Sequence, residues 1–167
     1  GRLDELAGSA REGGLLLSDG LPWRLGELYL PKPILHIAPG DGARPEGDRK
    51  AFSRLRYVPY SRFGEYIAGL SSQNVDAANM SAEFGMRYMT THAAVSGLPQ
   101  TMPYSVEVVR FLPGCGLYCI ALCAGQPQEE LLDILFRNLG HAGIGGRKTS
   151  GLGKFTVARE AAPAGLA

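Results

Sequence analysis

The spacing of apolar residues along the chain predicts a mixture of short strands and helices. Apolar runs and alternating apolar positions predict strands over residues 15–17, 27–30, 83–93, 104–111, 116–124 and 155–158. Pro113-Gly114 predicts a tight hairpin turn into the 116–124 strand. That strand is apolar on both faces, so we expect it to be central in its sheet.

Helical spacing predicts three helices. Residues 2–12 carry Leu3, Leu6 and Ala10 on one face, and Ser61 is expected to cap a helix over 62–70. The clearest helix begins at Pro127, has an apolar stripe from Leu131 to Leu139, and is expected to stop at Gly140. A turn is predicted over 18–23 and a loop over 38–48. The order of elements in the C-terminal half predicts an α+β fold of ferredoxin-like type.

Composition places the chain among ordinary globular proteins. Hydrophobic residues make up 45% of the 167 residues and charged residues 20%, and the net charge is +1. A nucleic-acid site must therefore be a local patch, because there is no global basic field. The sequence has neither a run of about 18–20 apolar residues nor a signal-peptide pattern, which predicts a cytoplasmic protein.

The three cysteines lie every fourth residue on one apolar segment. On a strand, Cys115, Cys119 and Cys123 would project from the same face. Zinc sites normally use closer cysteine pairs or nearby histidines, and three thiols cannot form a closed disulfide set. We expect small buried core residues, and neither a metal nor any other cofactor.

A glycine-rich, basic loop follows the clearest helix. Glycines leave backbone N–H groups open to a bulky anion, while cations and hydroxyls add charge and donors. We favour phosphate binding over the alternative of a solvent-exposed turn. The candidate residues are Gly143, Gly145, Gly146, Arg147, Lys148, Thr149, Ser150, Gly151, Gly153 and Lys154.

A second basic segment, residues 49–63, interleaves cations with aromatic side chains. Such a pattern suits a surface that follows phosphates and stacks bases, with Arg54 and Arg56 as candidates to extend the groove. It equally suits a solvated strand face whose aromatic residues enter the core. The segment alone does not decide between the two.

The order of elements around the loop argues against nucleotide-hydrolysing and dinucleotide-binding enzymes. Walker and Rossmann loops lie between a strand and a following helix, whereas here the helix precedes the loop. The residues Gly146-Arg147-Lys148-Thr149 also lack the full Walker spacing. His92, or His141 beside the loop, could act as a general base in RNA cleavage, but a structural histidine is the commoner case.

Several segments together resemble the CRISPR-associated RAMP superfamily. The helix followed by Gly143-Ile144-Gly145-Gly146-Arg147-Lys148-Thr149-Ser150-Gly151-Leu152-Gly153-Lys154-Phe155 resembles its glycine-rich loop. Leu17-Ser18-Asp19 with Pro22, then Leu28-Tyr29-Leu30-Pro31-Lys32-Pro33, then Pro103-Tyr104-Ser105-Val106 resemble the type III-A (Csm) subunit that binds the 5′ handle of crRNA. The resemblance spans residues 15 to 157. That family normally begins with a strand and helix that have no counterpart here, so the chain is expected to be a fragment lacking the first strand.

The resemblance implies an RRM-like fold of ferredoxin-like units with antiparallel sheets and a protruding β-hairpin thumb. It divides the chain into an N-terminal RAMP-like portion (1–80), the thumb (81–104) and a C-terminal portion with the glycine-rich loop (105–167). The loop would hold the crRNA backbone, with Ser18 and Lys32 as further RNA-binding candidates. On the thumb, Arg87 and His92 would press between guide and target bases.

The function implied is that of a non-catalytic crRNA-binding subunit in antiviral defence. Its partners would be the crRNA 5′ handle, the target RNA at the thumb, and the large polymerase-like and backbone subunits of the Csm complex, without a membrane. Two alternatives stay open. One is a RAMP-type endoribonuclease that processes crRNA with a histidine, and the other is a protein-binding scaffold.

Overall fold

A computed structural model describes residues 15–33, 46–72, 75–94 and 102–163. Backbone contacts divide the chain into two compact units. Unit 1 combines residues 1–19 with residues 119–167, and unit 2 is residues 20–118. The sequence predicted three portions, with boundaries after residues 80 and 104. These boundaries differ from those of the two units, and the three portions stay a prediction. The predicted helix over residues 2–12 lies outside the described residues.

Unit 2 contains a four-stranded antiparallel sheet with the strand order β4-β3-β2-β7. Its strands are β2 (Leu21–Arg24), β3 (Glu27–Pro31), β4 (Tyr57–Pro59) and β7 (Cys115–Tyr118). The Tyr118 hydroxyl donates to the carbonyl oxygen of Tyr29 at 3.0 Å and so ties β7 to β3 across β2. Every strand pairing among the described residues is antiparallel, which confirms the α+β class with antiparallel sheets.

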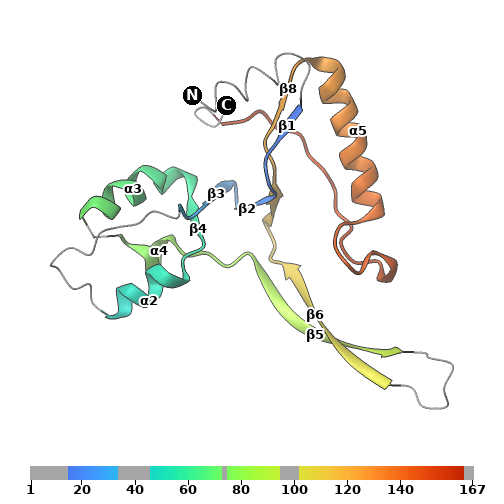
Figure 1. Cartoon of the computed structure of the whole chain (residues 1–167), viewed down its shortest axis with the longest axis horizontal. Helices are drawn as coiled ribbons and strands as arrows, with labels where there is room; N and C mark the ends of the chain where they lie inside the picture. Colours follow the sequence, from blue (N-terminus) through green and yellow to red (C-terminus); the bar gives the residue numbers. More distant parts are fainter. Residues whose placement is uncertain (1–14, 34–45, 73–74, 95–101, 164–167) are drawn as a thin grey trace. The chain divides into compact units, whose positions relative to one another are not determined.

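The helices of unit 2 lie close together beside β4 (Figure 1), and their side chains form the hydrophobic core of the unit together with that strand. They are α2 (Glu46–Arg54), the 3-10 turn η1 (Tyr60–Arg62), α3 (Phe63–Ser72) and α4 (Ala77–Met80). Tyr66 stacks on Phe52 with ring centroids 6.3 Å apart, which joins α3 to α2. The buried side chains of this core are Leu55, Val58, Tyr66, Leu70, Ala77 and Met80.

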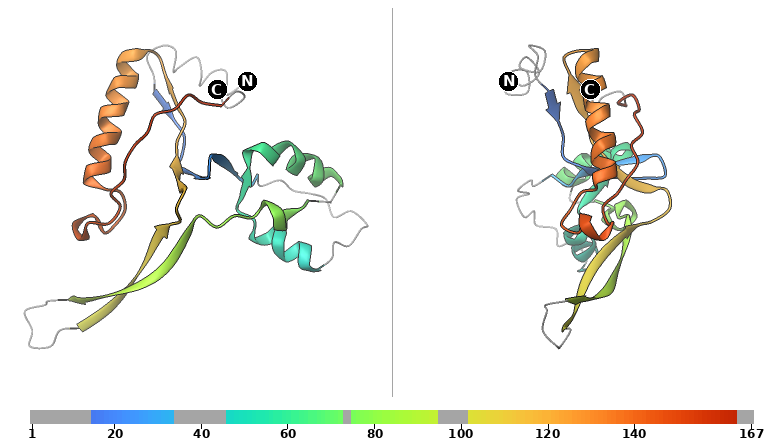
Figure 2. Two further views of the ribbon diagram at one scale, coloured as in Figure 1. Left: turned by 180° about the vertical axis from the view of Figure 1, so that it is seen from behind. Right: turned by 90° about the vertical axis from the view of Figure 1, so that its right-hand side faces the viewer.

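Two long strands of unit 2 form the predicted hairpin (Figure 2). They are β5 (Gly85–Ala94) and β6 (Met102–Phe111), paired in register from Gly85 opposite Phe111 to Ala94 opposite Met102. The strands predicted over 83–93 and 104–111 are therefore confirmed within two residues at each end. Both strands are rich in β-branched and aromatic residues, which suits an extended ribbon.

The described residues of unit 1 form a strand pair, a long helix, the glycine-rich loop and the segment that follows it. Strand β1 (Leu15–Leu17) pairs with β8 (Ala121–Cys123), and helix α5 runs from Gln126 to Ala142. After the glycine-rich loop, the chain runs back alongside α5 (Figures 1 and 2). An ion pair between Arg159 and Glu129 ties this returning segment to the first turn of the helix.

The prediction of a single central strand over residues 116–124 is wrong. It divides at Cys119–Ile120 into β7, at an edge of its sheet, and β8, in a different sheet. At this break, the backbone N–H of Ile120 donates to the Ser18 hydroxyl at 2.8 Å. The cysteines consequently do not share one strand face, and they are half-buried free thiols rather than core residues.

Six local predictions also need correction. Residues 46–54 form helix α2. The predicted loop therefore does not extend to residue 48, and the first part of the basic segment 49–63 is not a strand. Ser61 lies inside η1 and caps nothing, because Pro59 occupies the capping position. The predicted 18–23 turn becomes strand from Leu21 onward, where it pairs with β3 and β7. Residues 155–158 form no strand, and α5 continues two residues beyond Gly140.

Candidate nucleic-acid interface

The glycine-rich loop is closed at its base by hydrogen bonds between its two ends. Gly143, with φ of +82°, ends α5 and donates its N–H to the carbonyl oxygen of Leu139 at 2.7 Å. The N–H of Ile144 donates to Gly153 at 3.0 Å, and that of Phe155 donates to Gly140 at 3.2 Å. These bonds fix where the loop leaves the helix and where it returns.

The loop contains a short 3-10 turn that holds its polar residues at the surface. The turn, η2, spans Lys148–Ser150 and closes with a hydrogen bond from the N–H of Gly151 to Lys148 at 2.9 Å. The side chains of Arg147, Lys148, Thr149, Ser150 and Lys154 are all exposed. Three cations and two hydroxyls are therefore open to solvent on one short loop of unit 1.

Gly145 and Gly146 leave open space where other residues would carry a Cβ. A Cβ built at either position would meet no atom within 4 Å. Among the described residues, no backbone carbonyl accepts a hydrogen bond from the N–H of either glycine. Adjacent unengaged N–H groups beside cations can accommodate a phosphate oxygen, because no side chain blocks its approach.

Gly153 has a different function in the same loop. Its φ is +77°, and a Cβ there would clash with the backbone carbonyl of Ile144. A side chain at this position is excluded by the fold itself. The loop thus contains glycines that closure requires and glycines that closure does not require.

Two other predicted RNA-binding residues make structural contacts within their own units. The Ser18 hydroxyl accepts from Ile120 and donates to the Asp19 carbonyl oxygen at 2.9 Å. The Lys32 ammonium lies 4.4 Å from the centroid of the Phe52 ring and donates to the Phe52 carbonyl oxygen at 2.9 Å. Burial lowers the pKa of Lys32 below its ordinary value, because the charged form loses hydration. Lys32 therefore stabilises the last turn of α2, and RNA contact by either residue stays a prediction.

Arg54 and Arg56 flank a core residue. Arg54 ends α2 and Arg56 precedes β4, and both side chains are exposed, whereas Leu55 between them is buried. Burial of Leu55 turns both guanidinium groups away from the core of unit 2. They form an exposed basic pair, as a groove extension requires.

The hairpin carries both thumb candidates, each with a partner on the opposite strand. Arg87 forms an ion pair with Glu107, with Nη1 and Oε1 3.0 Å apart. The His92 ring stacks on Tyr104, its direct cross-strand neighbour, with centroids 5.6 Å apart. His92 Nε2 also lies 3.1 Å from the Thr90 hydroxyl. The hairpin therefore presents a stacked aromatic pair on one face and an exposed charge pair on the other.

The histidines lie in no recognisable catalytic arrangement within the described part of the chain. His92 contacts Thr90 and Tyr104, and His141 is exposed in the last turn of α5. Over the same residues, no group of three or more His, Cys, Asp or Glu side chains could hold a metal ion. None of the described helices is long and apolar enough to span a bilayer.

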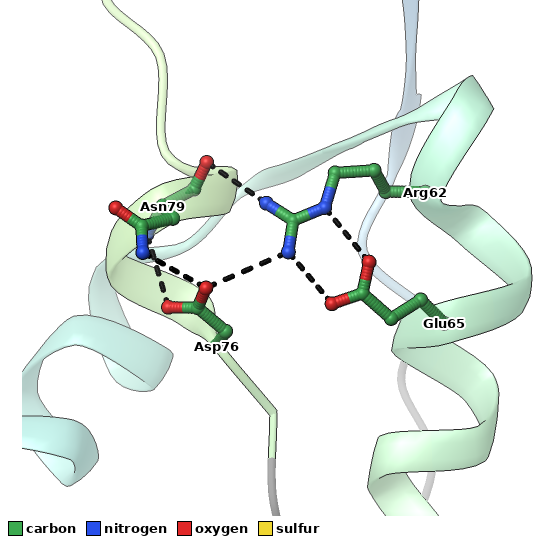
Figure 3. Close-up of polar contacts among 4 residues, drawn as sticks. All are labelled: Arg62, Glu65, Asp76 and Asn79. Atoms are coloured by element: carbon green, nitrogen blue, oxygen red, sulfur yellow. Dashed lines mark hydrogen bonds and ion pairs between the residues drawn. The ribbon is translucent and has the colours of Figure 1, made fainter.

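Arg62 lies in the basic segment 49–63, whose two interpretations the sequence left open, and the sequence did not predict the polar cluster around this residue (Figure 3). Its guanidinium donates to both carboxylate oxygens of Glu65, at 2.8 and 2.6 Å, and to the carbonyl oxygen of Asn79 at 3.1 Å. Asp76 lies 3.5 Å away and caps α4. The i,i+3 spacing of Arg62 and Glu65 was the available signal. The cluster joins η1 and α3 to α4, so Arg62 stabilises unit 2.

Comparisons with curated proteins identify the relatives. Over 154 residues, or 91% of the chain, the sequence is 31% identical to the "CRISPR system Cms protein Csm4" of Mycobacterium tuberculosis strain H37Rv, and likewise to that of strain CDC 1551. This chain is a homologue of the Csm4 proteins. The Csm4 of Streptococcus thermophilus is 24% identical over 94% of the chain. The predicted resemblance is thereby confirmed.

The chain spans about half the length of the curated Csm4 proteins that it matches, namely 48% of those from M. tuberculosis and 50% of that from S. thermophilus. No protein-family model matches the sequence.

Proposed function

We propose that the chain is a non-catalytic crRNA-binding subunit of a type III CRISPR interference complex and that its glycine-rich loop binds the 5′ handle of the guide. The observation that carries the proposal is the exposed, unengaged backbone at Gly145 and Gly146 beside Lys148 and Lys154. Homology to Csm4 supports it.

The loop would bind the RNA backbone rather than the bases. N–H groups, ammonium groups and a guanidinium all favour phosphate oxygens, and such contacts position a strand without reading its sequence. Thr149 and Ser150 add short donors on the same turn, which would fix the register of the strand. Arg54 and Arg56, which belong to unit 2, would make phosphate contacts of their own with the RNA.

The hairpin would act as the thumb between guide and target. His92 stacked on Tyr104 offers an aromatic surface on which a displaced base can stack. Arg87 would exchange its exposed partner Glu107 for a phosphate, at little cost because an exposed ion pair contributes little stability. Protein partners would be the large polymerase-like subunit and the backbone subunit of the complex.

Gly146→Ala tests the proposal because the fold does not need this glycine. The position has open space and no positive φ, so alanine leaves the unliganded loop intact. In the assembled complex, we expect the Cβ to hinder phosphate approach and weaken crRNA binding about tenfold, the cost of roughly one charge-assisted hydrogen bond.

Gly64→Ala is the matched control. Gly64 lies exposed in α3 with open space around it, so alanine there should leave crRNA binding unchanged. If the Gly146 variant binds crRNA as tightly as the control, the loop backbone is not the binding site.

Incubation of the wild-type complex with repeat RNA, without added metal, should leave the RNA intact. Cleavage that is lost in His92→Ala or His141→Ala would instead show an endoribonuclease.

A further inference from the structure

The link between β1 and β2 contains one residue more than the link between β7 and β8. β1 pairs with β8 and β2 pairs with β7, and these pairings leave residues 18–20 in the first link and residues 119–120 in the second. As at a β-bulge, the longer link has a residue without a counterpart, and its backbone groups are left out of the ladder.

Ser18 takes the hydrogen bonds that are available in this link. Its N–H donates to the carbonyl oxygen of Ile120 at 2.8 Å, and its hydroxyl accepts from the Ile120 N–H at 2.8 Å. Among the described residues, no acceptor engages the Gly20 N–H and no cation pairs with the Asp19 carboxylate. Asp19 and Gly20 are both exposed. The carboxylate and the next backbone amide are therefore open to water and to each other.

Glycine makes this pair the most reactive of its kind. It has no Cβ to keep its backbone nitrogen away from the carboxyl carbon of the preceding aspartate. A Cβ built on Gly20 would meet a single atom within 4 Å, the tip of the Leu117 side chain at 3.9 Å, so the fold does not confine the link either. We infer that Asp19-Gly20 is a site at which the chain modifies its own backbone, by forming a cyclic imide that opens to isoaspartate.

The reaction needs water and no other co-reactant. The Gly20 nitrogen attacks Cγ of Asp19, an N–Cγ bond forms, and the carboxyl hydroxyl leaves with the amide proton as water. Water then adds to the backbone carbonyl carbon of Asp19, and the bond from that carbon to the Gly20 nitrogen breaks. The backbone now runs through Cβ and Cγ and is longer by one methylene, and the former backbone carbonyl is a free carboxylate. The mass is unchanged, because one water is lost and one is gained.

The modification falls where the chain passes from one unit to the other. Asp19 ends the first segment of unit 1, and Gly20 begins unit 2. The added methylene lengthens this connection. The Asp19 carbonyl oxygen that accepts from the Ser18 hydroxyl at 2.9 Å becomes part of a carboxylate. This inference concerns the chain's own chemistry and does not depend on RNA binding.

Asp76-Ala77 provides a matched comparison within the same chain. Asp76 is also exposed, but its carboxylate accepts from the Asn79 side chain at 2.9 Å. The Ala77 N–H donates to the carbonyl oxygen of Val75 at 2.9 Å. Both contacts must open before the nitrogen can reach the carboxyl carbon. We therefore expect the fold to protect Asp76 and to leave Asp19 unprotected.

Peptide mapping of the full chain tests the inference. The chain is incubated near neutral pH, both folded and in guanidinium chloride, and isoaspartate is quantified at each aspartate by electron-transfer mass spectrometry. Folding should change the rate at residue 19 by less than about twofold and slow the rate at residue 76 at least about tenfold. The mapping must resolve individual sites, because Asp41-Gly42, outside the described residues, is a second pair of the same kind.

Gly20→Ala is the control variant. Gly20 has no positive φ and has room for a Cβ, so alanine keeps the fold. It should slow isoaspartate formation at residue 19 at least about fivefold, because the Cβ crowds the attacking nitrogen. In heavy-oxygen water, each isoaspartate should contain a new oxygen atom, as hydrolysis of the imide requires. Protection of Asp19 to the same extent as Asp76, an unchanged rate in Gly20→Ala, or isoaspartate without heavy oxygen would overturn the inference.

Discussion

Gly140 and Phe155 lie in direct backbone contact at the base of the glycine-rich loop. The N–H of Phe155 donates to the carbonyl oxygen of Gly140 at 3.2 Å, and a Cβ on Gly140 would lie 2.5 Å from the carbonyl oxygen of Phe155. A backbone oxygen cannot rotate away as a side chain can, so the residue in this turn of α5 must be glycine. The contact determines where the loop closes.

Gly140→Ala should therefore loosen the loop even though alanine favours helix. The gain in helix propensity is about 1 kcal/mol. Forcing the backbone of Phe155 away from α5 costs about 1–3 kcal/mol and breaks the hydrogen bond that the Phe155 N–H donates to the carbonyl oxygen of Gly140. Trypsin cleavage after Arg147 or Lys148 in the assembled complex should accelerate about tenfold, as a shift of about 1.4 kcal/mol in loop opening would produce. Cleavage at the wild-type rate, matching Gly64→Ala, would show that the contact does not hold the loop.

Removing two loop cations should change the salt dependence of crRNA binding. Each phosphate contact on single-stranded RNA releases about 0.7 counterion, so Arg147→Ala combined with Lys148→Ala should lower the slope of log K against log salt by about 1.4. Arg137→Ala is the control, because Arg137 is an exposed cation of the same unit that pairs with Asp133. An equal slope in both variants would remove these two cations from the interface.

Acid should weaken unit 2 through the cluster at Arg62. The hydrogen bond from Arg62 lowers the pKa of Glu65 below its ordinary 4.5, and the bond from the Asn79 amide lowers that of Asp76 below 3.8. A lowered pKa means that the native state favours the ionised carboxylate. The resulting stability is present above the ordinary pKa and is lost as pH falls through the native one.

The wild-type Tm should accordingly fall between about pH 5 and pH 3 more steeply than that of Arg62→Met, whose Glu65 has lost its partner. Fluorescence of Trp23, the single tryptophan, reports unit 2 specifically. Parallel Tm curves for the two proteins over this range would show that the cluster contributes no stability.

Substitution of two methionines by alanine should distinguish a core position from a surface position in unit 2. Met80 is 1% exposed and packs among the buried residues of α3 and β4, whereas Met86 on the hairpin is 62% exposed. Met80→Ala should lower the free energy of unfolding by about 3 kcal/mol, and Met86→Ala should change it by less than about 0.5 kcal/mol. Urea denaturation followed by Trp23 fluorescence measures both. Similar midpoints for the two variants would contradict the assigned core.

Local patterns predicted the elements whose partners are close in sequence. The residues of β5 and β6, which are close in sequence, pair with each other, and the apolar stripe and Pro127 of α5 predicted nearly all of that helix. The division of the 116–124 segment was not predictable in the same way. It depends on β2 and β1, which lie about a hundred residues away and belong to different units, so pattern alone could not place the break.

In the candidate site too, residues whose contacts are local could be predicted from the sequence, and residues whose contacts are distant in sequence could not. The glycine-rich loop was recognisable from its own residues, because open glycines and cations adjoin in sequence. Ser18 and Lys32 could not be interpreted from sequence, since their contacts to Ile120 and Phe52 are made across the fold. The Arg62 cluster likewise draws on three elements, and only its i,i+3 pair is visible locally.

We propose that this chain holds the 5′ handle of a guide RNA in a CRISPR complex. The most direct measurement is to co-express the chain with a guide array and the other complex subunits, purify the complex through a tag on this chain, and sequence the retained RNA. We predict RNAs that share one repeat-derived 5′ end and that are lost from the Arg147→Ala/Lys148→Ala complex. Complexes that retain no RNA, or RNA without a common 5′ end, would contradict the claim.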